Sequence, residues 1–369
     1  IRRPPRSTLD RSSAASDVYK RQLSAYTYPW KKILIGIFIT AACALSAVAI
    51  GSVYIPAFSI FSILFSKLFF FQGSDHLTPS SHTIIWDIRF PRVVLALLVG
   101  ASLGISGATY QGLFKNPLAD PYLIGVASGA SLGATLVFLT GLPFTYGYFS
   151  LLPVASFCGG LAAVYIAYLI SHNSGDTQLS TLLLAGLAIG AFATAITGIL
   201  MLRSDPDLRP LLSWLMGGFI RAQWNHSILM IPYMAVGTIF ILGYSRILNT
   251  MQLEEYYSES LGVDVEKTKR VLIISATLMT SAAVSFSGLI GFVGLIAPHV
   301  IRLLWGTDYR TILPLSGIAG AAFLVLADLT ARTIISPVEL PVGIITALVG
   351  SPFFVYLLLK SKRTIENGY

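Results

Sequence analysis

Charged residues are scarce in this sequence. Only 11% of the 369 residues are Asp, Glu, Lys or Arg, whereas 54% are hydrophobic and the mean hydropathy is +0.73. A soluble domain needs a polar surface around its core, so this composition excludes one. The apolar runs each reach or approach the roughly 20 residues that a membrane-spanning helix needs. The composition therefore predicts an integral membrane protein with no room for a separate soluble catalytic domain.

Several sequence motifs for disulfides, nucleotide binding and metal binding are also missing. The two cysteines, Cys43 and Cys158, lie far apart in apolar runs, which excludes a disulfide framework and a thiolate metal site. No Gly-Lys dipeptide occurs, so the chain has no phosphate loop for a nucleotide, and it has no H-E-x-x-H zinc motif. The five histidines are scattered: His76, His82, His172, His226 and His299. We therefore expect no catalytic residue, no metal site and no cofactor on this chain.

The first 22 residues differ from the rest. They carry no apolar segment and no initiator Met, and they resemble translated adapter-derived sequence. Six basic residues against two aspartates give them a net charge of +4, half of the formal +8, so the remaining charge is no argument for nucleic-acid binding. We expect residues 1–22 to be a non-native tail and residues 23–369 to form one transmembrane domain. The alternative is a disordered basic tail that contacts lipid phosphates.

Hydropathy predicts about ten transmembrane helices. They lie near residues 33–55, 93–114, 121–141, 150–170, 179–202, 227–245, 271–287, 289–305, 312–330 and 341–359. Residues 271–301 are too long for one crossing and short for two. With the amino end inside, counting this stretch twice puts 12 Lys and Arg inside and 7 outside, against 8 and 11 when it is counted once. The positive-inside rule favours two crossings, with a break at Gly288, Gly291, Gly294 and Pro298.

Two further patterns have open interpretations. Residues 211–219, LLSWLMGGF, are too short to cross and predict either a re-entrant or interfacial segment on the outer side or an ordinary loop. The spans are also rich in small residues, as in GASLGISGATYQG. Such faces favour tight helix packing, and the alternative is a smooth conduit for a bulky solute.

The spans are nearly free of ionisable groups. Asp328 is the clear exception, and its i,i+4 spacing to Arg332 predicts an ion pair near the outer end. Transporters driven by an ion gradient usually need ionisable groups within the membrane. Their scarcity argues against such a transporter, against an intramembrane enzyme, and for energy delivered by another chain.

Residues 246–270 form the largest interval expected on the cytoplasmic side. We expect the chain that supplies energy to act there. Leu253, Tyr257 and Leu261 are spaced by four residues, as on one helix face, and Gly262 suits a helix C-cap. Glu254, Glu255 and Glu259 point elsewhere. Such an apolar stripe can dock on a partner or lie on its own bundle.

Several motifs then occur in order over residues 33–362. They are IRFPRVVLALLVGASLGISGATYQGLFKNPLADPYLIGVASGASLGA, LLLAGLAIG, SLGVDVE, GFVGLIAPHVIRLLWGTDYR, LPLSGIAGAAFLVLADLTAR and ELPVGIITALVGSPFFVYLLLK. Together they resemble the FecCD-type permeases, the membrane subunits of ATP-binding-cassette (ABC) importers for ferric siderophores, haem and vitamin B12. The resemblance implies an all-α, type II importer fold of ten helices.

It also implies partners and a location. These are a second permease subunit, identical or paralogous, two ATP-binding subunits that hold ATP and Mg, an extracytoplasmic solute-binding protein and the lipid bilayer. The expected location is a bacterial or archaeal plasma membrane, with both termini cytoplasmic.

The resemblance assigns candidate sites residue by residue. Arg89, Arg92 and Arg332 match arginines that receive glutamates of the binding protein, and the charge count puts all three on the outer face. The alternatives are pairing with Asp87 or Glu339, or lipid phosphate anchoring. Residues 250–266 match the helices that couple to the ATPases, although Leu253 departs from the usual Leu-Gly-Glu-Glu. Asn116 and Ser180 match positions of the cytoplasmic gate.

We therefore expect a permease for a bulky iron chelate, haem or cobalamin, with a gradient-driven secondary transporter as the rival. The cargo does not follow from the sequence, because nothing in it resembles a dedicated metal site.

Overall fold

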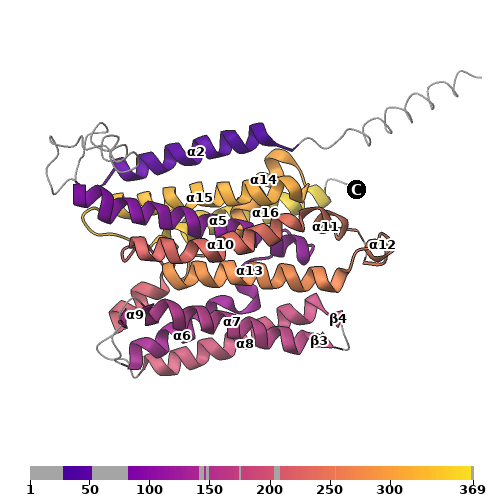
Figure 1. Ribbon diagram of the computed structural model, residues 1–369, viewed down its shortest axis with the longest axis horizontal. Coiled ribbons are helices and arrows are strands. Elements are labelled where there is room, and N and C mark those ends of the chain that lie inside the picture. The colour runs from indigo at the N-terminus through magenta and orange to yellow at the C-terminus, as the bar shows by residue number, and fades with distance from the viewer. Residues whose placement is uncertain are drawn as a thin grey trace, which may run out of the picture.

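The computed structural model describes residues 28–51, 82–140, 145–146, 149–173, 176–202, 208–253 and 255–366. Within them the chain is helical apart from two short hairpins, in which β1 (Thr145–Tyr146) pairs with β2 (Phe149–Ser150) and β3 (His172–Asn173) with β4 (Asp176–Thr177). Figure 1 shows the long helices side by side along one axis. The helices are α2 (Trp30–Ala49), the π-helix η1 (Ile84–Arg89), α5 (Phe90–Leu113), the 3-10 helix η2 (Pro121–Ile124), α6 (Val126–Thr140), α7 (Leu151–Ser171), α8 (Leu179–Met201), α9 (Leu208–Leu215), α10 (Trp224–Gly243), α11 (Ser245–Thr250), α12 (Glu255–Ser260), α13 (Val265–Ser287), α14 (Val293–Trp305), α15 (Tyr309–Thr333) and α16 (Val342–Glu366).

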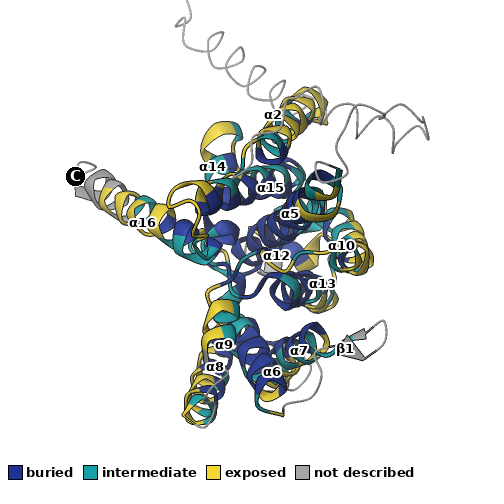
Figure 2. Ribbon diagram, turned by 90° about the vertical axis from the view of Figure 1, so that its left-hand side faces the viewer, coloured by how far each residue is buried: buried dark blue, intermediate teal, exposed yellow. Residues whose placement is uncertain are grey.

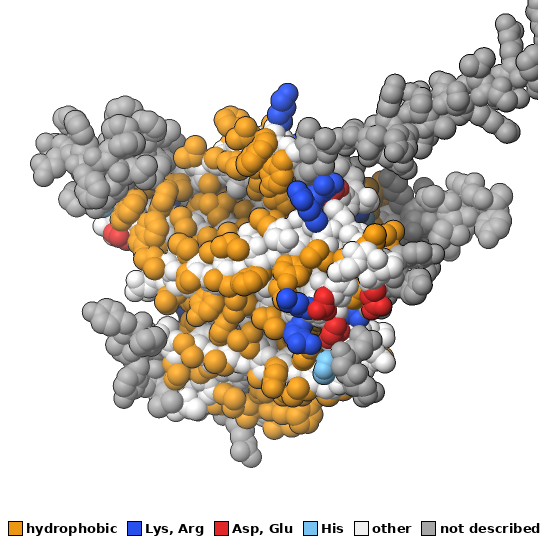
Figure 3. All heavy atoms as spheres, turned by 45° about the vertical axis from the view of Figure 1, so that its right-hand side comes forward, with side chains coloured by type: hydrophobic (Ala, Val, Ile, Leu, Met, Phe, Trp, Pro, Cys, Tyr) orange, Lys and Arg blue, Asp and Glu red, His pale blue; other side chains and the backbone are white. Residues whose placement is uncertain are grey.

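These helices confirm the all-α polytopic fold. In the described part of the chain, seven helices are long and apolar enough to cross a membrane, and α6, α14 and the apolar part of α16 are shorter apolar helices. Each of the ten predicted spans coincides with one of them, although α2 ends at Ala49, before the predicted residue 55. Large apolar side chains such as Phe38, Leu184 and Phe192 are exposed on the flanks, as lipid contact requires. Figure 3 shows hydrophobic side chains across much of one face, with charged groups gathered toward one end.

The core is built on close helix packing. Figure 2 shows α5 and α13 as largely buried helices inside the bundle. A Cβ atom at Gly104 of α5 would lie 2.2 Å from the Ser316 carbonyl oxygen of α15, and one at Gly100 would lie 2.3 Å from the Gly320 carbonyl oxygen. Only glycine permits this approach of two backbones. In α5 and α15, the small residues therefore serve tight packing, which is one of the two interpretations that the sequence allowed.

The break in residues 271–301 is confirmed, at fewer positions than expected. α13 ends at Ser287, Gly288 has a φ of +69°, and Phe292 adopts the left-handed conformation before α14 begins. Gly294 and Pro298 lie inside α14, so their assignment to the break was wrong. Pro298 is the sixth residue of α14 and has no N–H to donate to the Gly294 carbonyl, which accepts from Gln111 Nε2 at 3.5 Å instead. The Tyr122 hydroxyl accepts from the Ile290 N–H at 3.2 Å and donates to its carbonyl at 3.0 Å.

Residues 211–219 do not cross the bundle. Their first part belongs to the eight-residue helix α9, and a turn with Gly217 at a φ of +67° follows. The Gly218 N–H donates to the Ser287 carbonyl at 2.7 Å, and the Gly217 carbonyl accepts from the Val342 N–H at 2.9 Å. This segment thus joins the end of α13 to the start of α16.

The predicted helix around residues 253–261 is shorter than expected. α11 ends at Thr250, Leu253 lies in a bend, and α12 begins only at Glu255, while Glu254 lies outside the described residues. Leu253 therefore does not share a helix face with Tyr257, and that part of the predicted stripe was wrong. The C-cap at Gly262 is confirmed, because its φ is +81° and its N–H donates to the Glu259 carbonyl at 2.8 Å.

Candidate functional sites

Two ends of the bundle carry the candidate sites. The arginine end holds Arg89, Arg92 and Arg332, at the start of α5 and the end of α15. The α11 end holds α11, α12, the loop with Asn116 and the start of α8 with Ser180. Figure 1 shows these ends at opposite extremes of the long axis, with the C-terminus at the α11 end.

The three arginines form one buried cluster. Arg89 donates from Nη1 to the Val48 carbonyl at 2.9 Å and to the Ala49 carbonyl at 3.1 Å. Arg332 donates from Nη2 to the Ala47 carbonyl. The carbonyl groups at the C-terminal end of α2 thus serve as acceptors for guanidinium groups, which the negative end of a helix dipole favours.

Two carboxylates complete this arginine cluster. Arg92 contacts Asp328 through Nε at 3.0 Å and Nη2 at 2.8 Å, and it contacts Glu339 Oε2 through Nη1 at 2.8 Å. The predicted pair of Asp328 with Arg332 is confirmed at 3.5 Å, and Arg92 is the nearer partner. Among the described residues, the three guanidinium groups of the cluster outnumber its two carboxylates, which contact Arg92 and Arg332. The sequence alternative of an Arg92–Glu339 pair is also present, whereas Asp87 is exposed.

The surface beside the arginine cluster is partly apolar. The connection from α15 to α16 exposes residues 333–339, among them Ile334, Ile335 and Val338. Glu339 belongs to this exposed connection, and its side chain is 36% accessible against 8% for Arg92. The arginine cluster therefore reaches solvent through Glu339.

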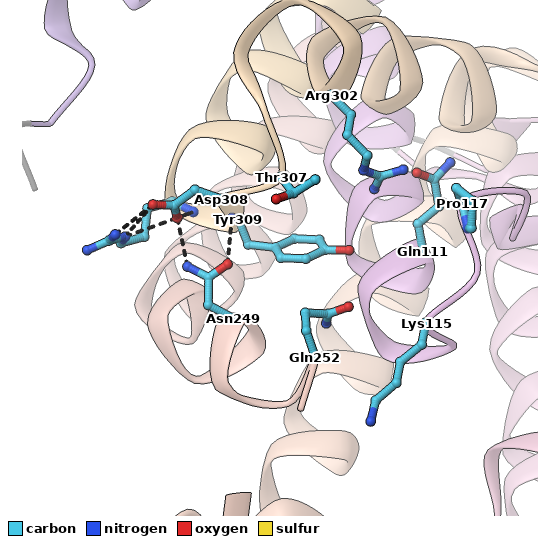
Figure 4. A pocket seen from close by; sticks show the side chains of 10 residues that line it. Gln111, Lys115, Pro117, Asn249, Gln252, Arg302, Thr307, Asp308 and Tyr309 are labelled. Atoms are coloured by element: carbon cyan, nitrogen blue, oxygen red, sulfur yellow. Dashed lines mark hydrogen bonds and ion pairs between the residues drawn. The ribbon is translucent and has the colours of Figure 1, made fainter. Parts of the chain in front are cut away.

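At the α11 end, a different set of contacts ties α11 to the bundle. Asn249 donates from Nδ2 to Asp308 Oδ1 at 2.7 Å and accepts from the Tyr309 N–H at 2.8 Å. Gln252 donates to the Gly112 carbonyl at 3.0 Å. Lys115 donates to the Leu253 carbonyl. Figure 4 shows these side chains around an open hollow of about 610 Å³.

Asp308 is the N-cap of α15. Its carboxylate accepts from the Arg310 N–H at 2.9 Å and pairs with the Arg310 guanidinium at 2.6 Å. Burial alone raises the pKa of the Asp308 carboxyl, but the hydrogen bonds from Arg310 and Asn249 outweigh it and hold the pKa below its usual range. The group that Asn249 contacts is therefore a carboxylate at neutral pH, and the contact is charge-assisted.

The other predicted coupling residues lie close by. Leu253 is 50% and Leu261 67% exposed, at an end of the bundle where charged residues gather. Glu255 and Tyr257 lie on α12, and Gly262 follows it. The side chains of both leucines are therefore accessible to a partner chain.

Asn116 and Ser180 belong to two separate elements at this end, the loop after α5 and the start of α8. The Asn116 side chain accepts from the Leu118 N–H at 2.9 Å and holds the turn after α5. Ser180 is exposed in the first turn of α8. The hairpin before α8 is fixed to α13, because Glu266 accepts from the Thr177 N–H at 2.9 Å.

Comparison with known proteins decides the family. The model of the FecCD transport family matches residues 37–360. The chain belongs to the FecCD transport family. It is 45% identical to the cobalamin import system permease protein BtuC of Halobacterium salinarum, over 76% of this chain and 74% of that protein. It is 42% identical to the hemin transport system permease protein HmuU of Yersinia pestis, over 76% of this chain and 84% of that protein.

A solved structure agrees with this assignment. A metal-chelate type ABC transporter in an inward-facing conformation, as that structure is described, is 29% identical, with a TM-score of 0.77 over 89% of this chain and 99% of that one. This FecCD chain is accordingly a multi-pass permease subunit of an ABC transporter and not an enzyme. Among its described residues, no three His, Cys, Asp or Glu side chains are grouped for a metal ion.

Sequence reasoning on this FecCD chain missed one junction. The pairing of Asn249 with Asp308 joins residues far apart in sequence, and neither residue lies in a pattern that predicts the other. The sequence does indicate one of the two residues, because Asp308 directly precedes an apolar helix and is recognisable as its N-cap. Nothing in the sequence indicates its partner Asn249.

Proposed function

We propose that this chain is the permease subunit of an importer for a bulky iron chelate of the ferric siderophore type, within a class that also includes haem and cobalamin. The observation that carries the proposal is the family match over residues 37–360, together with two relatives whose names specify cobalamin import and hemin transport. Residues 23–369 form one permease domain in this proposal.

The α11 end faces the cytoplasm in this proposal. In the described chain, the α11 end carries more basic residues than the arginine end. This difference supports the orientation under the positive-inside rule. At the α11 end they include Lys31, Lys32, Lys115, Arg246, Lys267, Lys269, Arg270, Arg302 and Arg310, and at the arginine end they are Arg89, Arg92, Arg209, Arg221 and Arg332. Both termini are then cytoplasmic.

The arginine end receives the solute-binding protein. Its excess positive charge supports attraction of an acidic partner, and charge complementarity speeds encounter and sets orientation. Because Arg92 already contacts Glu339, a carboxylate of the binding protein would take the place of Glu339 rather than meet a free guanidinium. The exposed Ile334, Ile335 and Val338 supply apolar contact beside it.

The α11 end receives the ATPases. The exposed Leu253 and Leu261 and the helix α12 with Glu255 and Tyr257 support a docking surface there, and Glu254 and Gly262 border it. ATP and Mg²⁺ bind to the partner chains. Movement of residues 250–266 then opens and closes the two mouths in turn, with Asn116 and Ser180 at the inner gate.

A second permease subunit completes the pathway. An apolar hollow of about 580 Å³ lies between α9 and α16, lined by residues that include Leu215, Met216 and Leu348. The later part of α16 exposes apolar side chains, and Figure 2 shows this helix extending from the bundle. These features support packing against an identical or paralogous subunit.

The test is reconstitution in vesicles with the ATPase and the binding protein encoded with this chain. We expect uptake that needs ATP and both partners and that survives an ionophore. Uptake by this chain alone, abolished by the ionophore, would instead establish the gradient-driven transporter. Cargo follows from comparing ferric siderophore, haem and cobalamin in the same vesicles.

A further inference from the structure

One helix connects the two candidate sites. α15 begins at Tyr309, beside α11, and its last turns carry Asp328 and Arg332 of the arginine cluster. At 1.5 Å per residue, its 25 residues span about 37 Å. A displacement of its first turn is therefore felt at the opposite end, provided that the helix moves as a whole.

The contact between α11 and α15 uses both polar atoms of one side chain. Asn249 Nδ2 donates to the Asp308 carboxylate and Asn249 Oδ1 accepts from the Tyr309 N–H, at 2.7 and 2.8 Å. Figure 4 shows both bonds on the α15 side of the hollow. Two bonds to adjacent residues fix orientation as well as distance, and the one to the carboxylate is charge-assisted. An aspartate at position 249 could accept but could not donate.

α11 also holds the neighbouring helix. Gln252 donates to the Gly112 carbonyl in the last turn of α5, and Leu248 and Tyr309 pack so closely that a Cβ at Gly112 would lie within 3.0 Å of both side chains. α11 and the turn that follows it thus hold the ends of both α5 and α15.

Beyond α11, α5 and α15 are locked to one another. Their backbones touch at Gly100 against Gly320 and at Gly104 against Ser316. At the arginine end, the Arg92–Asp328 pair closes the contact. Because packed interfaces rearrange between discrete states and do not slide continuously, these contacts keep the two helices together.

We propose that Asn249 is a positioning residue that transmits movement of α11 to the α5–α15 pair, so that the two helices carry the arginine cluster as one body. This inference rests on the proposed function, because it takes α11 as the element that ATPases move. It adds a named link from ATP hydrolysis to the surface that receives the binding protein. By linkage, docking of the binding protein must in turn act on the ATPases through Asn249.

The experiment uses the complete complex in nanodiscs and measures the ratio of the ATPase rate with the binding protein to the rate without it. Asn249→Asp replaces the donor with a second carboxylate facing Asp308. We expect this ratio to fall about tenfold toward one, a size typical of coupling between two sites. Asp308→Asn keeps an acceptor for Asn249 and should retain most of the stimulation. The double variant Asn249→Asp with Asp308→Asn restores a donor and acceptor pair and should regain it.

Failure of the inference about Asn249 and failure of the proposed function give different results. A ratio in Asn249→Asp equal to that of Thr194→Ala, whose hydroxyl donates to the Gly190 carbonyl within α8, would overturn the inference. If Asn249→Asp fails to assemble, the double variant decides, since an assembled double variant without stimulation overturns it as well. A complex of the unaltered chain without ATP-dependent uptake would instead overturn the proposed function.

Discussion

Arg92 and Glu339 meet at 2.8 Å, and Glu339 is the member of the pair that reaches water, with a side chain 36% exposed against 8% for Arg92. The opposite edge of Arg92 is committed to Asp328, which is 1% exposed. One guanidinium thus has a permanent partner on its buried edge and a replaceable partner on its outer edge.

Glu339→Gln should strengthen docking of the solute-binding protein. The change removes the carboxylate that a partner's carboxylate would displace from Arg92, and partly exposed pairs contribute about 0.2–1 kcal/mol, so we expect affinity to rise up to about fivefold. Surface plasmon resonance on nanodiscs measures it. Asp87→Asn removes an exposed charge at the same end and should have little effect. Weaker binding by Glu339→Gln would mean that Glu339 itself contacts the partner.

Asp328→Asn should destabilise the fold. The substitution keeps the shape but leaves the buried Arg92 and Arg332 without their shared anion, and breaking a buried ion pair costs about 3–5 kcal/mol. Thermal unfolding in detergent, compared with Glu339→Gln, measures it. Equal loss of stability in both variants would contradict the distinction between a permanent and a replaceable partner.

Gly104→Ala should also destabilise the fold, because its Cβ would lie 2.2 Å from the Ser316 carbonyl oxygen and force α5 and α15 apart. Overpacking of this kind costs about 1–3 kcal/mol. The matched control is Gly198→Ala in α8, where an added Cβ meets nothing within 4 Å. The same unfolding assay applies, and a Gly104→Ala variant as stable as the control would show that the helices separate at little cost.

Leu261→Asp should weaken association with the ATPase subunits while membrane insertion is retained. The side chain is 67% exposed at the α11 end, so its loss removes apolar contact only when a partner covers it. Co-purification at increasing salt measures the effect. Leu202 is 87% exposed beyond the opposite end of α8, so Leu202→Asp should leave the ATPases bound. Equal retention by both variants would argue that Leu261 lies outside the interface.

Hydropathy and charge were sufficient for the ten helices and for the break before α14, because both depend on properties of contiguous residues. Hydropathy and charge did not predict that the three arginines are buried or which groups they contact. Arg92 lies 236 positions from Asp328, and only the packing of α5 on α15 brings them together. The stripe through Leu253 failed for a local reason, because periodicity continued across a bend at residues 251–253 that carries no proline or glycine. Asn249 was missed because an isolated amide in a loop-like stretch gives no periodic signal.

The Tyr122 hydroxyl both donates to and accepts from the Ile290 peptide in the unwound stretch before α14. Phenylalanine has no polar atom, the tryptophan indole only donates, and histidine donates and accepts through different ring nitrogens, so only tyrosine among these side chains does both through one atom. The side chain at residue 122 is therefore tied to the backbone path before α14 by two hydrogen bonds. A phenylalanine there would strand two polar backbone groups inside the protein, and the path of the chain into α14 would have to change.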